Sequence, residues 1–291
     1  MTKTISALLA FIPLVFTFAV HAQDKPYSPY VGQNFPINVY FGDTHLHTNI
    51  SFDAYGDGNI NMGPDEAYRF AKGEQLKGHD GQPVRMSRPL DFLVIADHAE
   101  YMAIVQGVSE RNKLLTATEA GARWSKMAQE KGGLLRVFGE MVNDGATNQP
   151  RDLGSGFAKS VWQGVGEAAE RHNDPGRFTA FIGYEYSSLP EGDNLHRVVV
   201  FRDGPEKTNQ TVPFSLFDSE NPEDLWKYMA TYEAKTGGRV FSIPHNGNLS
   251  AGRMFSTKDF KGKPFTRKYA EMRAKWEEME HCKRWTHLII W

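Results

Sequence analysis

Tyr40-Phe41-Gly42-Asp43-Thr44-His45-Leu46-His47-Thr48 is the stretch on which both the fold and the chemistry depend. The mostly apolar residues 37–41 predict a buried strand that leads into it. Because alternate side chains of a strand point to the same face, we expect Asp43, His45 and His47 to share one side. Two imidazoles from one backbone edge form half of a zinc, manganese or iron site. A single His-x-His pair is weak evidence by itself, since histidine is also common in cores and on surfaces.

Further along the chain, apolar runs repeatedly border residues of metal-ligand type. The runs are 90–96, 178–184, 197–201 and 239–244. The polar candidates beside the runs, together with the first pair, are His45, His47, Asp97, His98, Glu100, Glu185, His196 and His245. Asp53 lies in a polar loop, 49–63, and is either a further ligand or a turn residue. Because so many residues of metal-ligand type lie at the ends of expected strands, we predict that they form one shared metal site.

Helices are expected between these strands, at 64–78, over most of 101–150, at 157–171 and at 222–235. Pro64 suits the first turn of a helix, and the acids that follow it complement the helix dipole. The loop between the second and third of these regions is expected at 145–156. Strands that alternate with helices predict an α/β fold with a parallel sheet, whose carboxyl ends converge on one site.

Composition describes an ordinary globular chain. The 291 residues are 40% hydrophobic and 23% charged, and the net charge is −2. Neither this charge nor any run of Lys or Arg supports a nucleic-acid partner. Cys282 is the one cysteine, which excludes an internal disulfide.

Residues 1–22 predict a secretory signal peptide. Lys3 supplies the positive start, residues 5–20 are the apolar stretch, and Val20-His21-Ala22 suits cleavage. The apolar stretch is shorter than the ~20 residues of a membrane span, so we expect cleavage and no stable membrane anchor. The expected location is the bacterial periplasm or the medium. Residues 23–38, which contain three prolines, predict an extended entry segment.

Five strings make the chain recognisable: FGDTHLHT, LDFLVIADHAEY, FIGYEYSS, HRVVVF and IPHN. They resemble the polymerase-and-histidinol-phosphatase (PHP) superfamily of metal-dependent hydrolases, and more closely its exported domain-of-unknown-function 3604 relatives. The resemblance implies a distorted (βα)7 barrel that carries two or three divalent metal ions (Zn, Mn or Fe). It implies one ion on His45, His47 and Glu185, one on Glu185, His196 and His245, and one on His98, with Asp53 as a candidate partner.

The chain departs from these relatives at its end. Relatives carry a late Asp-x-His, which is missing after residue 245, and they are about twice as long. We therefore interpret 39–276 as a partial PHP-like domain, a barrel incomplete at its C-terminal end, and 277–291 as an atypical tail that resembles a frameshift or premature end.

The resemblance implies hydrolysis of a small phosphate ester, or of a sulfate ester, by a metal-activated water. Arg197 would stabilise the anion, or would form only an ion pair; Glu100 or Asp97 would orient the water or a ligand imidazole. Two other hypotheses stay open. One is a truncated, non-catalytic metal-binding remnant, and the other is an amidohydrolase, another barrel with His-x-His on its first strand.

Overall fold

The computed structural model describes residues 38–78 and 80–277. The signal peptide expected at 1–22 lies outside the described residues, as do most of the expected entry segment and residues 278–291 of the expected tail. Glu277, by contrast, is described. It is buried and closes the last helix, so this residue belongs to the folded domain.

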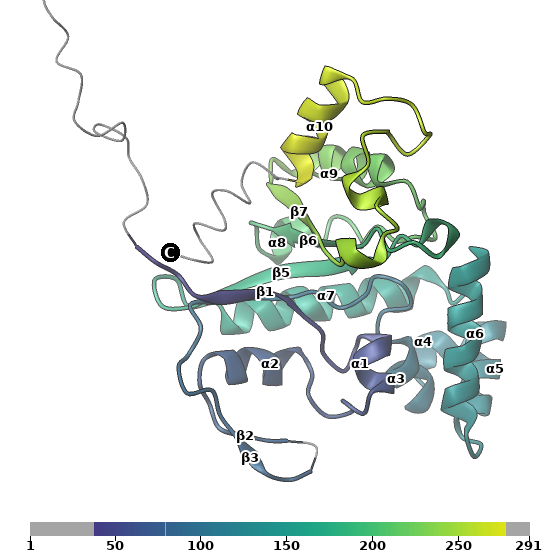
Figure 1. Cartoon of the computed structure of the whole chain (residues 1–291). Coiled ribbons are helices and arrows are strands. Elements are labelled where there is room, and N and C mark those ends of the chain that lie inside the picture. Colours follow the sequence, from purple (N-terminus) through teal and green to yellow (C-terminus); the bar gives the residue numbers. More distant parts are fainter. Residues whose placement is uncertain (1–37, 79, 278–291) are drawn as a thin grey trace, which may run out of the picture. The chain divides into compact units, whose positions relative to one another are not determined.

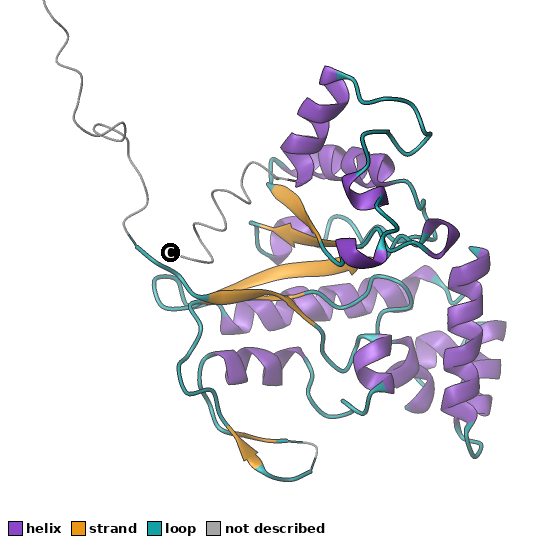
Figure 2. Ribbon diagram, viewed as in Figure 1, coloured by secondary structure: helices purple, strands orange, loops and turns teal. Residues whose placement is uncertain are grey.

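A curled five-stranded sheet forms the centre of the fold (Figures 1 and 2), with the strand order β1-β4-β5-β6-β7. The strands are β1 (Gly42–Leu46), β4 (Phe92–Ile95), β5 (Thr179–Tyr186), β6 (Arg197–Phe201) and β7 (Val240–Pro244). The first three are parallel, whereas β6 is antiparallel to both of its neighbours. The described residues thus form a mixed α/β half-barrel, and a seven-stranded barrel remains a prediction.

The return strand β6 explains why the sheet is mixed. The connection from β5 to β6 has ten residues and contains only the short 3-10 helix η1 (Pro190–Gly192). A parallel crossover needs a dozen or more residues, so this connection turns the chain back beside β5. The sequence indicates a return strand at 195–201, and β6 confirms this over residues 197–201.

The first strand begins later than the sequence predicts. Val39, Tyr40 and Phe41 are 44%, 43% and 41% exposed, and β1 starts at Gly42. The prediction of a buried strand at 37–41 is therefore wrong for its described part. The physical reason is position: β1 is the edge strand, paired in the described residues only with β4. Apolar residues that precede an edge strand are not covered on both sides.

Small apolar residues line the concave face of the sheet. Val94, Ala96, Val198 and Val200 form a buried cluster there. Gly183 of β5 lies in the same row, because an ideal Cβ at this position would be 2.6 Å from Val94 Cγ1 and 2.9 Å from Val199 O. Neighbouring strands approach closely at this point, and each strand then continues toward its polar end.

The convex face packs against helices and forms the main core. The helices are α2 (Pro64–Ala71), α7 (Ser155–His172), α8 (Pro205–Thr208), α9 (Pro222–Thr236) and α10 (Arg267–Glu277). Trp162 of α7 contacts Tyr184 and Phe201 of the sheet, with ring centroids 5.9 Å apart in both pairs. All three side chains are almost completely buried. The expected helices at 157–171 and 222–235 are confirmed.

A second group of helices, one before β4 in the chain and the others after it, has its own apolar core. It consists of α1 (Phe52–Gly56), α3 (Ile104–Ser109), α4 (Lys113–Thr116), α5 (Glu119–Ala128) and α6 (Gly133–Thr147). The mostly helical character expected for 101–150 is confirmed, although α6 extends three residues into the loop expected at 145–156. None of the helices in the described part of the chain combines the length and apolar character that a membrane crossing requires.

The helix expected at 64–78 is shorter than predicted. α2 ends at Ala71, and Lys72 and Gly73 turn the chain, with φ of Gly73 at +84°. A two-stranded hairpin follows, formed by β2 (Leu76–Lys77) and β3 (Pro83–Val84). The other short elements are the 3-10 helices η2 (Gly247–Leu249) and η3 (Arg253–Phe255), which follow β7.

Candidate metal centre

The carboxyl ends of the parallel strands bring the predicted residues together. His45 lies in β1, and His47 follows it two residues later on the same side. His98 and Glu185 are opposite each other in an isolated parallel bridge that extends the pairing of β4 with β5. On the other side, the backbone N–H of His245 donates to His196 O at 3.3 Å. The site therefore lies beyond the strand ends and continues the row of side chains that lines the concave face of the sheet.

Glu185 is the centre of this cluster. Its Oε2 lies 2.9 Å from His45 Nε2 and 2.7 Å from His47 Nε2. Its Oε1 lies 2.5 Å from His196 Nδ1 and 2.7 Å from His245 Nε2. The residue is fully buried. The prediction that these five side chains lie close together is confirmed by the geometry.

A second part of the cluster is formed by His47, Asp53 and His98. Asp53 Oδ2 lies 2.8 Å from His47 Nδ1 and 3.5 Å from His98 Nε2. Asp53 lies in the first turn of α1, where Ser51 Oγ donates to its other oxygen at 2.6 Å. The structure therefore places Asp53 with the candidate ligands rather than in an isolated turn. The ring of Phe52 stacks on His98, with centroids 4.6 Å apart.

Three overlapping groups of these side chains have the donor types and the spacing to hold a metal ion. In each group the ligand atoms lie within 4.8 Å of one another. The groups are His45, His47 and Glu185; His47, Asp53 and His98; and His98, Glu185 and His196. Imidazole nitrogens with carboxylate oxygens suit zinc, iron and manganese. The residues present therefore fit divalent ions.

The charges of the cluster follow from these contacts. Burial opposes the protonated form of His47, but the hydrogen bonds with Asp53 and Glu185 outweigh burial and raise its pKa to about 10. Burial favours a neutral Glu185, yet its four imidazole partners hold its pKa well below the usual range. The pKa of Asp53 is lowered despite burial, because it contacts His47 and His98. The contacts thus favour the ionised form of both carboxylates, as ligands of a cation require, whereas a metal ion on His47 would have to displace its proton.

Asp97 and Glu100 lie beside the cluster and bind backbone. Asp97 accepts from the backbone N–H of Thr48 at 2.5 Å and from its hydroxyl at 2.9 Å. Burial raises the pKa of Asp97 to about 6, although the hydrogen bonds from Thr48 oppose this shift. Glu100 Oε1 accepts from the backbone N–H groups of Ser187 and Leu216. The structure therefore has these acids fixing the ends of β1 and β5 rather than contacting a cluster imidazole.

Arg197 is not brought into the cluster. Its Nη2 lies 3.0 Å from Glu277 Oε1, and its Nη1 donates to Leu195 O. Both Arg197 and Glu277 are almost completely buried. The sequence left two roles open for Arg197, stabilisation of an anion or an ion pair. The contacts match the ion pair, which is buried.

Ser187 is a neighbour of the cluster that the sequence analysis did not single out. It follows β5 immediately, and its Oγ lies 2.5 Å from His98 Nδ1. This contact leaves His98 Nε2 directed toward Asp53. The only sequence signal was its place two residues after Glu185, since serine itself is too common to point to a site.

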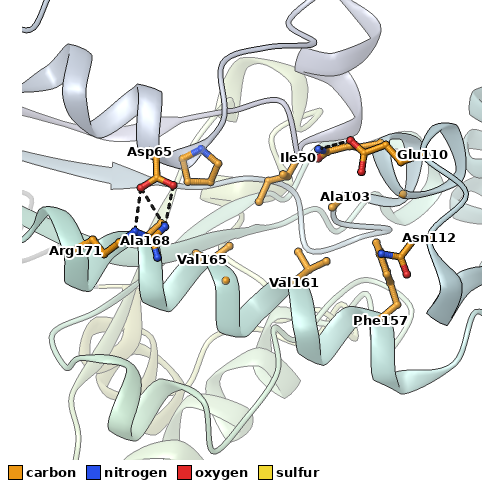
Figure 3. A pocket seen from close by; sticks show the side chains of 14 residues that line it. Ile50, Asp65, Ala103, Glu110, Asn112, Phe157, Val161, Val165, Ala168 and Arg171 are labelled. Atoms are coloured by element: carbon orange, nitrogen blue, oxygen red, sulfur yellow. Dashed lines mark hydrogen bonds and ion pairs between the residues drawn. The ribbon is translucent and has the colours of Figure 1, made fainter.

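A cavity of about 280 Å³ lies away from these residues, between α3, α7 and the start of α2 (Figure 3). Its wall is mainly apolar, with Ile50, Val161 and Val165, and the ion pair between Asp65 and Arg171 lies at one end. None of the predicted site residues lines it. The chemistry of the cluster is therefore separate from this cavity.

Comparison with known proteins places the chain in a family. The model of a family described as "Protein of unknown function (DUF3604)" matches residues 34–283, so the chain belongs to this family. The match includes every residue of the cluster. Neither the curated proteins nor the solved structures that were searched contain a match to the chain.

Proposed function

For this member of the DUF3604 family we propose an exported, metal-dependent hydrolase of phosphate esters, with sulfate esters as a variant substrate. One observation carries the proposal. A fully buried carboxylate, Glu185, lies within hydrogen-bonding distance of four imidazoles. A second carboxylate, Asp53, joins one of these four, His47, to a fifth imidazole, His98. A structural core rarely gathers this many ligand-type side chains at one point. Membership of the PHP superfamily is part of the proposal.

The residues divide into sets for two or three divalent ions, Zn, Mn or Fe. His45, His47 and Glu185 form one set. Glu185 also faces His196 and His245, which form a second set. Asp53 with His98 completes a third. Divalent ions there would supply a water of lowered pKa and positive charge beside the ester.

The other side chains keep this arrangement rigid. Asp97 holds the backbone of Thr48 and so fixes the end of the segment that carries His47. Phe52 and Ser187 contact two sides of the His98 ring and set its orientation. Ligands that are held in place from outside bind a metal more tightly than mobile ones, because less entropy is lost on binding. The proposed centre is therefore preorganised by its own chain.

The experiment compares His45→Ala with His172→Ala in the full chain. His172 is another partly buried histidine, but it contacts Asp65 and Lys72 far from the cluster. We expect elemental analysis to show two or three ions per wild-type chain, fewer in His45→Ala and an unchanged number in His172→Ala. Hydrolysis of p-nitrophenyl phosphate or p-nitrophenyl sulfate should follow the metal content.

Wild-type protein without bound metal after incubation with zinc, manganese or iron would reject the proposal. Bound metal with hydrolysis of a cyclic amide instead of an aryl ester would favour the amidohydrolase hypothesis, and bound metal with no hydrolysis would favour the non-catalytic remnant.

Export is a separate part of the proposal and depends on residues 1–22. If a signal peptide is removed at the expected position, the mature protein begins at Gln23. N-terminal sequencing of protein from a periplasmic fraction checks this, and an intact Met1 in cytoplasmic protein would contradict it.

A further inference from the structure

Two strongly exposed apolar side chains belong to the segment that follows β7. Leu249, at the end of η2, is 60% exposed, and Phe255, at the end of η3, is 66% exposed. Single exposed apolar residues are common on protein surfaces and need no explanation. These two are different because the chain fixes both of them beside the metal cluster.

Phe255 is connected to the cluster through Gly247. An ideal Cβ at Gly247 would lie 2.5 Å from Phe255 Cε2, so the ring packs directly against the backbone of this glycine. Gly247 is two residues after His245, and two residues span at most about 7 Å. His245 Nε2 is 2.7 Å from Glu185 Oε1. The aromatic ring is therefore next to the segment that carries a proposed metal ligand.

Leu249 is connected to the cluster by a second route. Its carbonyl oxygen accepts from the backbone N–H of Asn194 at 3.0 Å. The side-chain oxygen of Asn194 in turn accepts from the backbone N–H of His196 at 3.1 Å. Thus Leu249 is joined by two hydrogen bonds to another residue of the cluster. Two independent connections therefore attach Leu249 and Phe255, together called the apolar rim, to segments that carry residues of the cluster.

Ion pairs of Arg253 hold this rim in place and neutralise the positive charge of the guanidinium. Arg253, at the start of η3, has Nε 2.5 Å from Asp193 Oδ2 and Nη2 2.7 Å from Glu191 Oε2. Asp193 precedes Asn194, so the ion pairs and the Leu249 hydrogen bond attach the rim to the same loop. The guanidinium is therefore engaged by two carboxylates rather than presented to a second anionic group of a substrate.

We propose that the rim of Leu249 and Phe255 binds the alcohol part of the ester, and that this part is apolar, with an aryl group as the best fit. The inference rests on the proposed function, because it places the scissile ester at the metal cluster. An exposed aromatic ring and an exposed leucine gain by covering an apolar group, and neither offers a hydrogen bond to the hydroxyl groups of a polar alcohol. The substrate class is thus the phosphate or sulfate monoesters of phenols and apolar alcohols.

Phenylphosphonate and methylphosphonate test this directly, since neither is hydrolysed and both carry the same anionic head. Calorimetric titration of the metal-loaded, full-length protein should show about tenfold tighter binding of phenylphosphonate, the usual size of one good apolar contact. Phe255→Ala and Leu249→Ala should each lower this ratio several-fold. Gly247→Ala should also lower it, because the added Cβ displaces the Phe255 ring.

Leu135→Ala is the matched control. Leu135 is 75% exposed but lies on α6, among the helices of the second core, so its removal should leave the ratio unchanged. Metal content, measured for every variant, shows that the cluster is intact.

Several results would overturn the inference. Equal binding of the two phosphonates by metal-loaded wild type would reject it and leave the proposed function standing. If both Phe255→Ala and Leu249→Ala left the ratio of phenylphosphonate to methylphosphonate affinity unchanged, the inference would also be rejected and the proposed function would stand. If these variants instead abolish self-association seen by light scattering and leave the ratio unchanged, the rim binds a second copy of the chain. Metal-loaded protein that binds neither phosphonate would reject the inference together with the proposed function.

Discussion

His196, the residue before β6, and Arg197, its first residue, are consecutive in the chain, yet their side chains lie on opposite faces of the sheet. His196 Nδ1 is 2.5 Å from Glu185 Oε1 on the concave side, whereas Arg197 Nη2 is 3.0 Å from Glu277 Oε1 among the convex-side helices. The alternation of side chains along a strand accounts for this separation. The start of β6 therefore contributes to the candidate centre through the residue before the strand, and the first residue of the strand attaches α10 to the sheet.

Arg197→Met should destabilise the fold and spare the metal centre. Glu277 keeps a second partner, because Arg273 Nε lies 2.7 Å from its Oε2. The variant therefore loses one buried, charge-assisted contact, and we expect a loss of about 1.5–3 kcal/mol in the free energy of unfolding. Urea denaturation measures this loss, and elemental analysis should show normal metal content. Arg202→Met is the control, because the Arg202 side chain is 63% exposed and its removal should change stability by less than about 0.5 kcal/mol.

A different outcome for Arg197→Met would restore the anion-binding role that the sequence suggested. In that case stability would be unchanged, while hydrolysis of an aryl phosphate would fall.

Gly183→Ala should destabilise the sheet. The added Cβ would lie 2.6 Å from Val94 Cγ1 and 2.9 Å from the backbone oxygen of Val199, which cannot move independently of the strand. Overpacking of this kind costs about 1–3 kcal/mol. Chemical denaturation tests the change, and the shift of β5 should also weaken metal binding at Glu185, two residues later.

Gly139→Ala is expected to act in the opposite direction and serves as the comparison. Gly139 lies inside α6, and nothing lies within 4 Å of an ideal Cβ there. Alanine in a helix interior is favoured over glycine by about 0.5–1 kcal/mol. Equal stabilisation by both substitutions would mean that β4 and β5 are less tightly packed than described.

Chelation should lower the thermal stability of the protein. A ligand that binds only the folded state at 100 times its dissociation constant adds about 2.7 kcal/mol. We therefore expect the unfolding temperature to fall in EDTA and to recover with added zinc, manganese or iron. Glu185→Gln should abolish most of this recovery, because the amide contributes no charge to the site. If added metal raised the unfolding temperature of Glu185→Gln as much as that of the wild type, the central role of this carboxylate would be contradicted.

Glu140→Gln should make the protein less sensitive to acid. The hydrogen bond from Arg123, opposed by burial and aided by Trp124, lowers the pKa of Glu140 from 4.5 to about 2. A carboxylate with a lowered pKa in the folded state stabilises it above pH 4.5, and this stabilisation disappears as the pH falls from 4.5 through 2. The contribution of such a partly exposed pair is at most about 1 kcal/mol. Unfolding curves at pH 7 and pH 3 should differ less in the variant than in the wild type, and an equal difference would contradict the assignment.

The sequence predicted the candidate centre better than the elements around it. His45, His47, Glu185, His196 and His245 could be found because each lies at the end of an apolar run, and strand ends converge in a sheet. The partner of Arg197 could not be found, because Glu277 is 80 residues away and only the folded chain shows that α10 covers β6.

Two local errors have physical reasons of the same kind. The hairpin of β2 and β3 has only two residues in each strand, too few to show an alternating pattern, so the helix expected at 64–78 includes β2. Residues 39–41 are apolar enough for a buried strand, but burial depends on neighbours in the sheet that sequence pattern does not identify.

The order of the strands also has a consequence for the rate of folding. Glu185, His196 and His245 all belong to the antiparallel part of the sheet, within 60 residues of one another, whereas His45 is 140 residues from Glu185. Pairing between distant segments is slow because a long loop must close first. We expect β5, β6 and β7 to form early and β1 to dock last, so that the candidate ligands His45 and His47 arrive at an already assembled half of the candidate centre. Pulse-labelled hydrogen exchange during refolding would show protection of β6 amides before those of β1, and simultaneous protection would contradict this order.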